Sequence, residues 1–397
     1  MKTLMIAPQP FFQPRGTPFS VLHRLKALTQ LGYKIDLLTY HLGADVEIDG
    51  VSIYRIPRIP FIKKIAIGPS KNKVILDVYL ILKAITMLRN GNYDLIHSHE
   101  EAGIFATYLA KIFGTLHLYD MHSSLPQQLS NFKFTRSKLL ISWFEKLENY
   151  TIKNAAAVIT ICPEMFNYVK RMFPNQYNTL IENVADNSLV FQTQPNSIHI
   201  KEKEKTNGEL IVLYTGTFEP YQGIDLLIES STRVIQQVDN VKYVLVGGIP
   251  TQVETYKNKV KALNLDKYFV FTGSISPEEV PQYIEDSDIL VSPRTDGNNT
   301  PLKIYSYLRS GKPIVATKHI THTQVLNSEV SILTDCTPEA FGEGVISVLK
   351  NADLRKKLGN KAKKLAEEKY SYQSFLNKTK EVYDYLEKQL EIRRRVH

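Results

Sequence analysis

The sequence is poor in cysteine and has no hydrophobic run long enough to cross a membrane. Its 397 residues include two cysteines, Cys162 and Cys336, which are too few for a disulfide framework or a cysteine-rich zinc site. The longest apolar stretch, Val74 to Leu88, contains Asp77 and Lys83 and is too short for a bilayer core of roughly 30 Å. The first residues lack the pattern of a signal peptide. These absences predict a cytoplasmic protein without a transmembrane helix.

Two ligand signatures are also missing. No Gly-x-Gly-x-x-Gly motif follows the first strand expected in either half, which argues against a two-domain dehydrogenase. No nucleic-acid reader motif and no basic run with interleaved aromatics is present, so nucleic acid is not an expected partner. The 49 Lys and Arg outnumber the 40 Asp and Glu, giving a formal charge of +9. This charge attracts anions, but it does not choose between nucleotide phosphates and anionic lipids.

The chain contains two series of short β-branched runs that alternate with amphipathic segments. Strands that alternate with helices predict parallel sheets covered on both faces, so the fold class is α/β with two domains. The expected domains are residues 1–185 and 209–371, joined by a polar linker at 186–208. A last helix, 372–397, is expected to cross back to the first domain. The expected strands are 4–7, 35–39, 51–56, 95–97, 116–120, 158–161, 210–215, 243–246, 269–272, 289–291 and 314–316.

The loop after the first strand ends in Arg15-Gly16-Thr17-Pro18. Thr17 can cap a helix, and Pro18 suits its first turn. A helix start carries free amides and roughly half a positive charge, so a phosphate can bind there beside Arg15. A plain capped turn is the alternative, and the two remain open on these residues.

Histidines follow two other expected strands of the first half. His122 comes after the strand 116–120, where an imidazole can exchange hydrogen bonds with a ligand in the crevice. A structural histidine is the alternative. His97, His99 and Glu100 end another strand and superficially resemble a metal site, but the sequence offers no third ligand. Polar contacts of His99 and Glu100 with a substrate are therefore favoured over zinc.

The densest signal lies between residues 291 and 317, where a loop rich in Gly and Asn leads into a helix. Thr300-Pro301 starts this helix, and its N-terminus favours an anion. Lys303 in the first turn adds a full charge, and Arg294 can approach from the loop. Asn299 adds a further donor.

These residues resemble the donor-binding segment of family 4 glycosyltransferases, which have the GT-B fold of two Rossmann-like domains facing across a cleft. The resemblance rests on Thr300-Pro-Leu-Lys303 followed by Tyr307-Leu-Arg-Ser-Gly311-Lys-Pro313. Further matching segments are Tyr214-Thr-Gly216-Thr-Phe-Glu-Pro-Tyr-Gln-Gly223, Val244-Leu-Val-Gly247-Gly248 and Ile181-Glu-Asn183-Val-Ala-Asp186. It covers nearly the whole chain.

The resemblance implies an enzyme that transfers a sugar from a nucleotide-sugar donor with retention of anomeric configuration and without a metal or other cofactor. In the family the nucleotide lies on the second domain, a histidine matching His122 contacts the transferred sugar, and the loop matching Gly16 approaches the diphosphate. The donor-binding residues so predicted are Gly16, Thr217, Gln222, Gly248, Arg294, Asn299, Thr300, Pro301, Lys303 and Ser306. The residues predicted on the acceptor side are Arg15, His99 and Glu100.

The sequence departs from the family pattern at both charged motifs. Thr217 and Gln222 replace the usual Arg and Lys that neutralise the diphosphate, and Asn298 and Ser306 replace the paired glutamates. Other cations can restore the balance together with helix N-termini. These cations are Lys303, Arg294 and Arg15. A module that binds nucleotide sugars without catalysis is the alternative.

The acceptor side suggests a lipid surface. Phe11-Phe12 and the segment 55–67 intersperse cations with apolar residues, a pattern typical of a lipid–water interface. The alternative is that these apolar residues belong to the core. With the family's frequent role in bacterial surface polysaccharide assembly, the pattern predicts a glycan or lipid-linked acceptor and a protein on the inner face of the plasma membrane.

Overall fold

A computed structural model describes residues 1–13, 16–65, 70–126, 129, 137–184 and 208–396. The chain divides into two compact units. The N-terminal unit comprises Met1–Asn183 and Gln373–His397, and the C-terminal unit comprises Val184–Tyr372. The predicted linker, residues 186–208, lies outside the described residues except for its last position.

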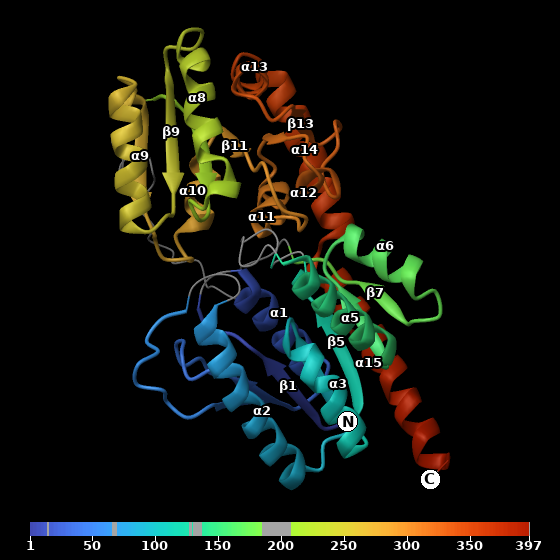
Figure 1. Ribbon diagram of the computed structural model, residues 1–397. Helices are drawn as coiled ribbons and strands as arrows, with labels where there is room; N and C mark the ends of the chain where they lie inside the picture. The colour runs from blue at the N-terminus through green and yellow to red at the C-terminus, as the bar shows by residue number, and fades with distance from the viewer. Residues whose placement is uncertain (14–15, 66–69, 127–128, 130–136, 185–207, 397) are drawn as a thin grey trace. The chain divides into compact units, whose positions relative to one another are not determined.

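The N-terminal unit is a seven-stranded parallel sheet with helices on both faces (Figure 1). Its strand order is β3-β2-β1-β4-β5-β6-β7. Its strands are β1 Thr3–Ala7, β2 Ile35–Thr39, β3 Val51–Arg55, β4 Leu95–His99, β5 Leu116–Met121, β6 Ala157–Thr160 and β7 Asn178–Leu180. Its helices are α1 Gly16–Gln30, α2 Lys71–Gly91, α3 Ala102–Phe113, α5 Lys138–Asn154, α6 Pro163–Met172 and α15 Tyr372–Val396.

The C-terminal unit is a six-stranded parallel sheet of order β10-β9-β8-β11-β12-β13. Its strands are β8 Leu210–Thr215, β9 Val241–Val246, β10 Phe269–Gly273, β11 Ile289–Ser292, β12 Ile314–Thr317 and β13 Ser331–Thr334. Its helices are α8 Ile224–Ile235, α9 Pro250–Ala262, α10 Val280–Asp286, α11 Leu302–Ser310, α12 Ile320–Thr323, α13 Pro338–Leu349 and α14 Ala352–Lys369, with short 3₁₀ turns at Pro220–Gln222 and Asp266–Tyr268. Both strand orders are those of doubly wound sheets, so the predicted fold class of two Rossmann-like domains is confirmed.

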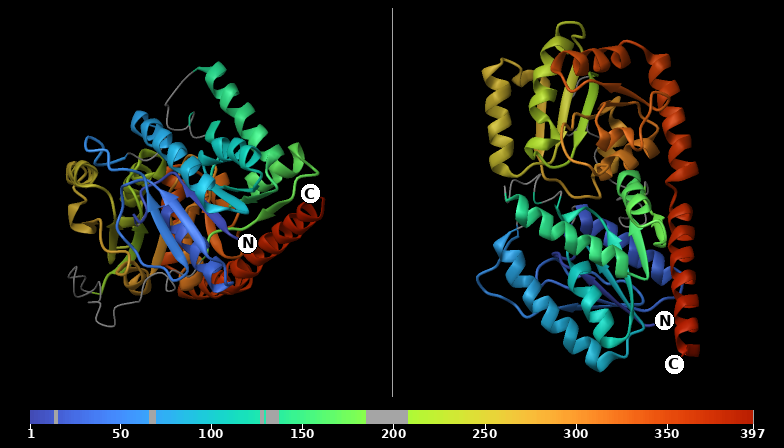
Figure 2. Two further views of the ribbon diagram at one scale, coloured as in Figure 1. Left: turned by 90° about the horizontal axis from the view of Figure 1, so that it is seen from below. Right: turned by 45° about the vertical axis from the view of Figure 1, so that its right-hand side comes forward.

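Each sheet separates two hydrophobic cores because successive side chains of a strand point to opposite faces. On β8, Val212 and Tyr214 join the core under α8, α9 and α13, whereas Ile211 and Leu213 join the core under α10, α11 and α14. In the N-terminal unit, α2 and α3 cover one face with Leu4, Ile6 and Ile96 beneath them. Figure 2 shows α2, α3 and α5 as one layer on this face, and α1 and α15 lie on the other.

Every expected strand is present, but two short edge strands were missed. β7 has three residues and β13 has four. Neither edge shows the run of β-branched residues that marks the inner strands, because an edge strand is buried less completely. The expected last helix is present as α15.

One expectation about the surface is corrected. Phe11 and Phe12 are buried, and so are the isoleucines of the segment after β3. These isoleucines are Ile56, Ile59, Ile62 and Ile65, which belong to the core under α2. Among the described large apolar side chains of that segment, Phe61 alone points outward, with 74% of its side chain exposed, and Ile67 lies outside the described residues. The core interpretation is therefore correct for these apolar residues.

Candidate functional site

In each unit the strand order reverses beside the first strand, between β1 and β4 and between β8 and β11. In open parallel sheets, ligands bind outside the carboxyl ends of the strands at this point. The loops that leave these four strands contain most of the residues predicted from the sequence.

In the C-terminal unit, two glycine loops pack backbone against backbone. Gly216 follows β8 with a φ of 137°, and Gly247 follows β9 with a φ of 122°. A Cβ on Gly247 would collide with the carbonyl oxygen of Gly216, and a Cβ on Gly248 would collide with the ring of Phe218. Only glycine fits these positions. The two loops therefore carry no side chain of their own at these glycines, and the Lys303 side chain lies beside Gly216.

The Lys303 side chain reaches from α11 to the residues of the β8 loop. Its Nζ lies 3.7 Å from the centroid of the Tyr214 ring and donates to Gln222 Oε1 at 3.4 Å. The Tyr214 hydroxyl donates to the carbonyl oxygen of Thr217 at 2.7 Å. Three predicted donor-site residues, Thr217, Gln222 and Lys303, therefore meet around one tyrosine.

Arg294 supplies a second cation beside Lys303. Its guanidinium lies over the Tyr221 ring, 5.0 Å from the centroid, and its Nε donates to the Asp296 carbonyl oxygen at 2.7 Å. Burial, and then the charge of Arg294, hold the pKa of Lys303 well below its usual range. No carboxylate among the described residues forms an ion pair with Lys303. Two half-buried cations thus lie close together without a full countercharge, which favours an anionic ligand.

The other predicted donor-site residues lie on the same loop and helix. Pro301 is the N-cap residue of α11, and Thr300 before it is buried. Asn299 and Ser306 are half-buried on the loop and the helix respectively. The structure places Asn299, Thr300 and Pro301 at the N-terminus of α11, whereas Ser306 lies in the middle of that helix.

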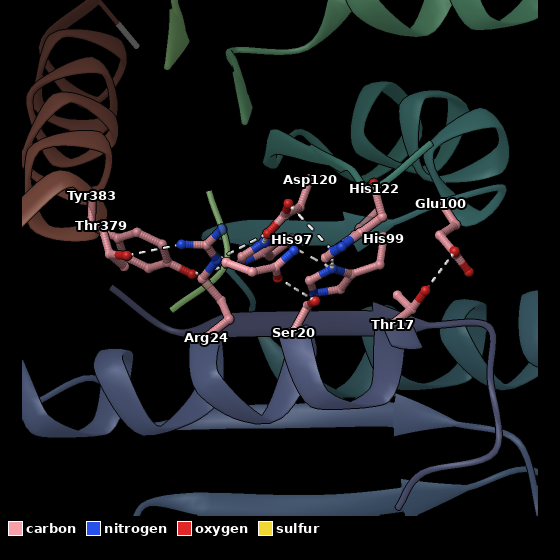
Figure 3. A network of polar contacts seen from close by, with 12 residues as sticks. Thr17, Ser20, Arg24, His97, His99, Glu100, Asp120, His122, Thr379 and Tyr383 are labelled. Carbon is pink, nitrogen blue, oxygen red and sulfur yellow. Dashed lines mark hydrogen bonds and ion pairs between the residues drawn. The ribbon is translucent and has the colours of Figure 1, made fainter. Parts of the chain in front are cut away.

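In the N-terminal unit, a buried polar network lies under α1 and α15 (Figure 3). Asp120 is its centre, and four cationic or imidazole nitrogens surround the carboxylate. They are Arg24 Nε at 3.0 Å, His97 Nε2 at 3.3 Å, His122 Nε2 at 3.4 Å and His99 Nδ1 at 3.8 Å. His99 Nδ1 and His122 Nε2 also share a hydrogen bond of 2.8 Å.

Helix α15 completes this network. The Thr379 hydroxyl accepts from Arg24 at 2.9 Å, and the Tyr383 hydroxyl lies 2.9 Å from His97 Nδ1. Strand alternation explains the grouping, because His97, His99 and Asp120 all point to the sheet face that α1 and α15 cover. The C-terminal helix thus helps to hold the histidines in place.

The network fixes the charge states of its members. Burial alone would raise the pKa of Asp120, but Arg24 and the histidines hold it well below its usual range. Burial lowers the pKa of His122 to about 4 and that of His99 well below its usual range, against the attraction of Asp120. His122 is therefore neutral at pH 7. A neutral imidazole suits a hydrogen bond with a sugar hydroxyl better than an ion pair with a phosphate.

The sequence offered no third ligand for His97 and His99, and the structure corrects this. Asp120 lies with them so that one ligand atom of each falls within 4.8 Å of the others. However, Arg24 already holds Asp120 Oδ2, and its guanidinium supplies the positive charge that a metal would bring. All four side chains are buried. The donor types fit a metal, but the paired arginine disfavours one here.

The remaining predicted residues of this unit lie around the start of α1. Gly16 begins α1 with a φ of 36°, whereas Arg15 lies outside the described residues. Glu100 accepts from the Thr17 hydroxyl at 2.9 Å and has a φ of 49°, a conformation that non-glycine residues avoid. Such outliers gather at ligand sites. The structure brings His99 and His122 together.

Several residues of these sites were missed by the sequence analysis. In the N-terminal unit they are Arg24, Asp120, Asn183, Thr379 and Tyr383; in the C-terminal unit they are Tyr214 and Tyr221. Asp120 had a usable signal, because it ends a strand two residues before His122. Arg24 and Tyr383 had none, since only the packing of α1 and α15 against β4 and β5 brings them to Asp120.

Two family models match the chain, one over each unit. The model described as Glycosyltransferase Family 4 matches residues 14–188, and the model described as Glycosyl transferases group 1 matches residues 196–365. Together they account for most of the sequence. The chain belongs to the family 4 glycosyltransferases. The predicted enzyme class is therefore confirmed.

Relatives of this glycosyltransferase are distant but match over nearly their full length. An uncharacterized glycosyltransferase, MJ1178 of Methanocaldococcus jannaschii, is 24% identical over 94% of this chain and 95% of its own. The phosphatidyl-myo-inositol mannosyltransferase of Mycobacterium tuberculosis is 20% identical over 90% of each chain. The crystal structure of Anabaena HepE in complex with UDP covers 97% of this chain and 100% of its own, with 17% identity and a TM-score of 0.73. The structural likeness shows the GT-B fold.

Proposed function

We propose that this glycosyltransferase moves a sugar from a nucleotide-sugar donor to a glycan or lipid-linked acceptor, with retention of anomeric configuration. The observation that carries the donor assignment is the pair Lys303 and Arg294. Two half-buried cations without a matching carboxylate, beside a helix N-terminus and glycine loops, suit a diphosphate. A structural neighbour, HepE, binds UDP according to its description, which supports a nucleoside diphosphate as the leaving group.

In this proposal cations from elsewhere in the C-terminal unit replace the two that the family pattern places in the β8 loop. Thr217 and Gln222 stand where the family has cations, and the Lys303 ammonium reaches Gln222 from α11. A bound diphosphate would favour the charged form of Lys303, which burial and the neighbouring Arg294 disfavour. The cations thus come from the loop after β11 and from α11, and not from the β8 loop.

His122 is the proposed contact with the transferred sugar. Its neutral state suits a hydroxyl, and Asp120 and His99 fix its orientation. The reaction is proposed to need no metal, because the cations that oppose the diphosphate belong to the chain. Turnover that persists in excess chelator would support this part, and turnover restored only by a divalent cation would contradict it.

The acceptor proposal rests on the family and on the named activity of a relative. The mycobacterial relative is described as a phosphatidyl-myo-inositol mannosyltransferase, whose name implies a lipid acceptor. We propose for this chain a glycan or lipid-linked acceptor on the cytoplasmic side of a membrane. Among the described residues, no helix combines the length and the low polarity that a bilayer-spanning segment needs.

The donor site is tested by substituting Lys303. In calorimetric titrations with nucleoside diphosphates and nucleotide sugars, Lys303→Gln should weaken binding of the preferred ligand about tenfold or more, because a partly desolvated charge pair is lost. Lys257→Gln is the matched control, since Lys257 is exposed on α9. Equal affinity of the wild type and the Lys303 variant would refute the assignment.

A second candidate function is a module that binds nucleotide sugars without transferring them. It is favoured by Asn298 and Ser306, which stand at the positions of the family's paired glutamates. Measurable donor binding with neither hydrolysis of the nucleotide sugar nor transfer to any acceptor would support this alternative. Release of nucleoside diphosphate during incubation with the sugar donor would exclude it.

A further inference from the structure

The outward face of α2 is apolar. Leu76, Leu80 and Ala84 of this helix point into the core, whereas the opposite side exposes a row of large apolar side chains. Their exposed fractions are 62% for Val74, 38% for Ile75, 52% for Val78, 41% for Tyr79 and 57% for Leu82. At 3.6 residues per turn they fall within an arc of about 140°. We call these five residues the α2 stripe.

Cations lie at both ends of the α2 stripe. Lys71 and Arg89 are exposed in the first and last turns of α2, about five whole turns apart, so they share the face of the stripe. The preceding segment adds Arg58, Lys63 and Lys64, all exposed. This segment is held against α2, because its buried isoleucines pack into the same core as Leu76 and Leu80.

The whole region carries charge of one sign. Residues 51–93 contain eight Lys and Arg and a single acidic residue, Asp77. Asp77 accepts a hydrogen bond from the Tyr40 hydroxyl at 2.5 Å and is itself half-buried. Two of the cations, Arg55 and Lys73, pair with acids from outside the region. The other six have no ion pair within the described part of the chain.

An anionic bilayer surface matches this chemistry better than a protein partner does. Protein interfaces favour Tyr, Trp, Met and Arg, whereas the α2 stripe is mostly aliphatic, with Lys71 and Arg89 at its ends and Lys63 and Lys64 in the preceding segment. A helix that lies in the interface buries its apolar face at the acyl boundary and places its cations among the lipid phosphates. Lys71 and Arg89 are positioned to hold both ends of α2 at that level.

We propose that the α2 stripe is a membrane-docking surface, with α2 parallel to the plane of an anionic bilayer. The apolar side chains insert, while the exposed cations Lys71 and Arg89, with those of the preceding segment, contact lipid headgroups. This surface is separate from the donor site and from the Asp120 network, so docking does not depend on the proposed transfer reaction.

The first test is co-sedimentation of the full-length protein with vesicles. The wild type should bind vesicles of phosphatidylcholine with phosphatidylglycerol, should bind pure phosphatidylcholine much more weakly, and should lose binding as salt rises. Val74→Ser, Val78→Ser and Leu82→Ser combined should lower the partition coefficient about tenfold or more. Ile112→Ser with Leu139→Ser is the matched control, because these side chains are 73% and 86% exposed on α3 and α5.

A charge variant separates the electrostatic contribution. Lys71→Glu with Arg89→Glu should lower the partition coefficient by about fivefold or more for each cation. Lys257→Glu with Lys369→Glu, exposed on α9 and α14, should leave binding unchanged. All of these residues are exposed, so thermal unfolding should stay close to that of the wild type. No binding of the wild type to anionic vesicles, or equal binding of the stripe variant and the wild type, would overturn the proposal.

A fluorescence measurement reports insertion directly. The chain has one tryptophan, Trp143. In Trp143→Phe combined with Val78→Trp, the only indole lies on the α2 stripe, and its emission should shift to the blue with anionic vesicles. An unchanged emission while the protein is vesicle-bound would place another surface against the lipid.

Discussion

At the scale of single residues, Asp120 organises the N-terminal unit's site. One carboxylate accepts from Arg24 and approaches three imidazoles, and all of these groups are buried. A buried charge is tolerated only when it is paired and hydrogen-bonded. Arg24 therefore does more than stabilise the fold: it keeps Asp120 ionised, and Asp120 in turn orients His122.

His122→Ala tests the proposed sugar contact. Nucleotide-sugar turnover should fall about 100-fold or more if His122 stabilises the reacting sugar, as loss of a positioned donor does in other enzymes. Affinity for the nucleoside diphosphate should stay the same, because the cations proposed to bind it, Lys303 and Arg294, lie in the C-terminal unit. Turnover and affinity are measured on one preparation. Loss of both, or of neither, would remove the assigned role.

His41→Ala serves as the control for this experiment. His41 is half-buried, and its Nε2 lies 3.1 Å from the Ile62 carbonyl oxygen, outside the Asp120 network. Its substitution should leave turnover unchanged. Thermal unfolding of both variants shows whether a loss of activity comes from a loss of structure.

At the scale of elements, strands β4 and β5 carry an unusual number of buried histidines. His97 and His99 lie on β4, and His117 lies on β5 with its Nε2 2.7 Å from the Ser98 hydroxyl oxygen. A strand buried on both faces is normally apolar. These strands hold imidazoles because each ring finds a polar partner across the sheet, and burial keeps the rings neutral.

This arrangement predicts a dependence of stability on pH. Burial lowers the pKa of His117 to about 3 from the usual histidine value of about 6.5. Between about pH 3 and pH 6.5 the unfolded chain therefore binds a proton that the native chain does not, so acid destabilises the fold by at most about 1.4 kcal/mol per pH unit. In His117→Gln the free energy of unfolding should depend less steeply on pH, and the decrease in slope should correspond to about one bound proton. Urea unfolding between pH 4 and about pH 6.5 measures this slope.

Ser98→Ala is the matched control for the histidine. It removes the hydrogen bond to His117 but keeps the titrating ring, so it should lower stability without flattening the slope. Asp77 and Glu148 work in the opposite direction, because burial raises the pKa of each to about 7. The wild type and His117→Gln both contain these carboxyls, so the difference between their pH slopes comes from His117. An identical slope in wild type and His117→Gln would contradict the neutral buried imidazole.

At the scale of the whole molecule, the two units differ in how their cores are assembled. The C-terminal unit is continuous in sequence from Val184 to Tyr372, whereas the N-terminal unit needs residues from both ends of the chain. Val382, Tyr383 and Leu386 of α15 are fully buried. Without α15, Arg24 and His97 would lose Thr379 and Tyr383 as partners.

Fragments should therefore behave differently. Residues 208–372 alone should unfold cooperatively and bind the preferred nucleoside diphosphate. Residues 1–183 alone should lack a cooperative transition, since removal of α15 exposes apolar surface and leaves buried polar groups unpaired. A peptide spanning α15 should restore the transition. Calorimetry of the two fragments checks this, and a cooperative transition of 1–183 without the peptide would contradict it.

The sequence by itself determined the fold class, most of the strands and the family. These features are encoded locally, in the alternation of β-branched runs with amphipathic segments and in the loop and helix around Lys303. The tertiary structure decided which residues act together. Arg24, Asp120 and Tyr383 are far apart in the chain, and no local pattern links them. It also decided which apolar residues are exposed: Phe11 and Ile59 are core, whereas Val78 and Leu82 face outward, because the sheet covers only one side of each segment.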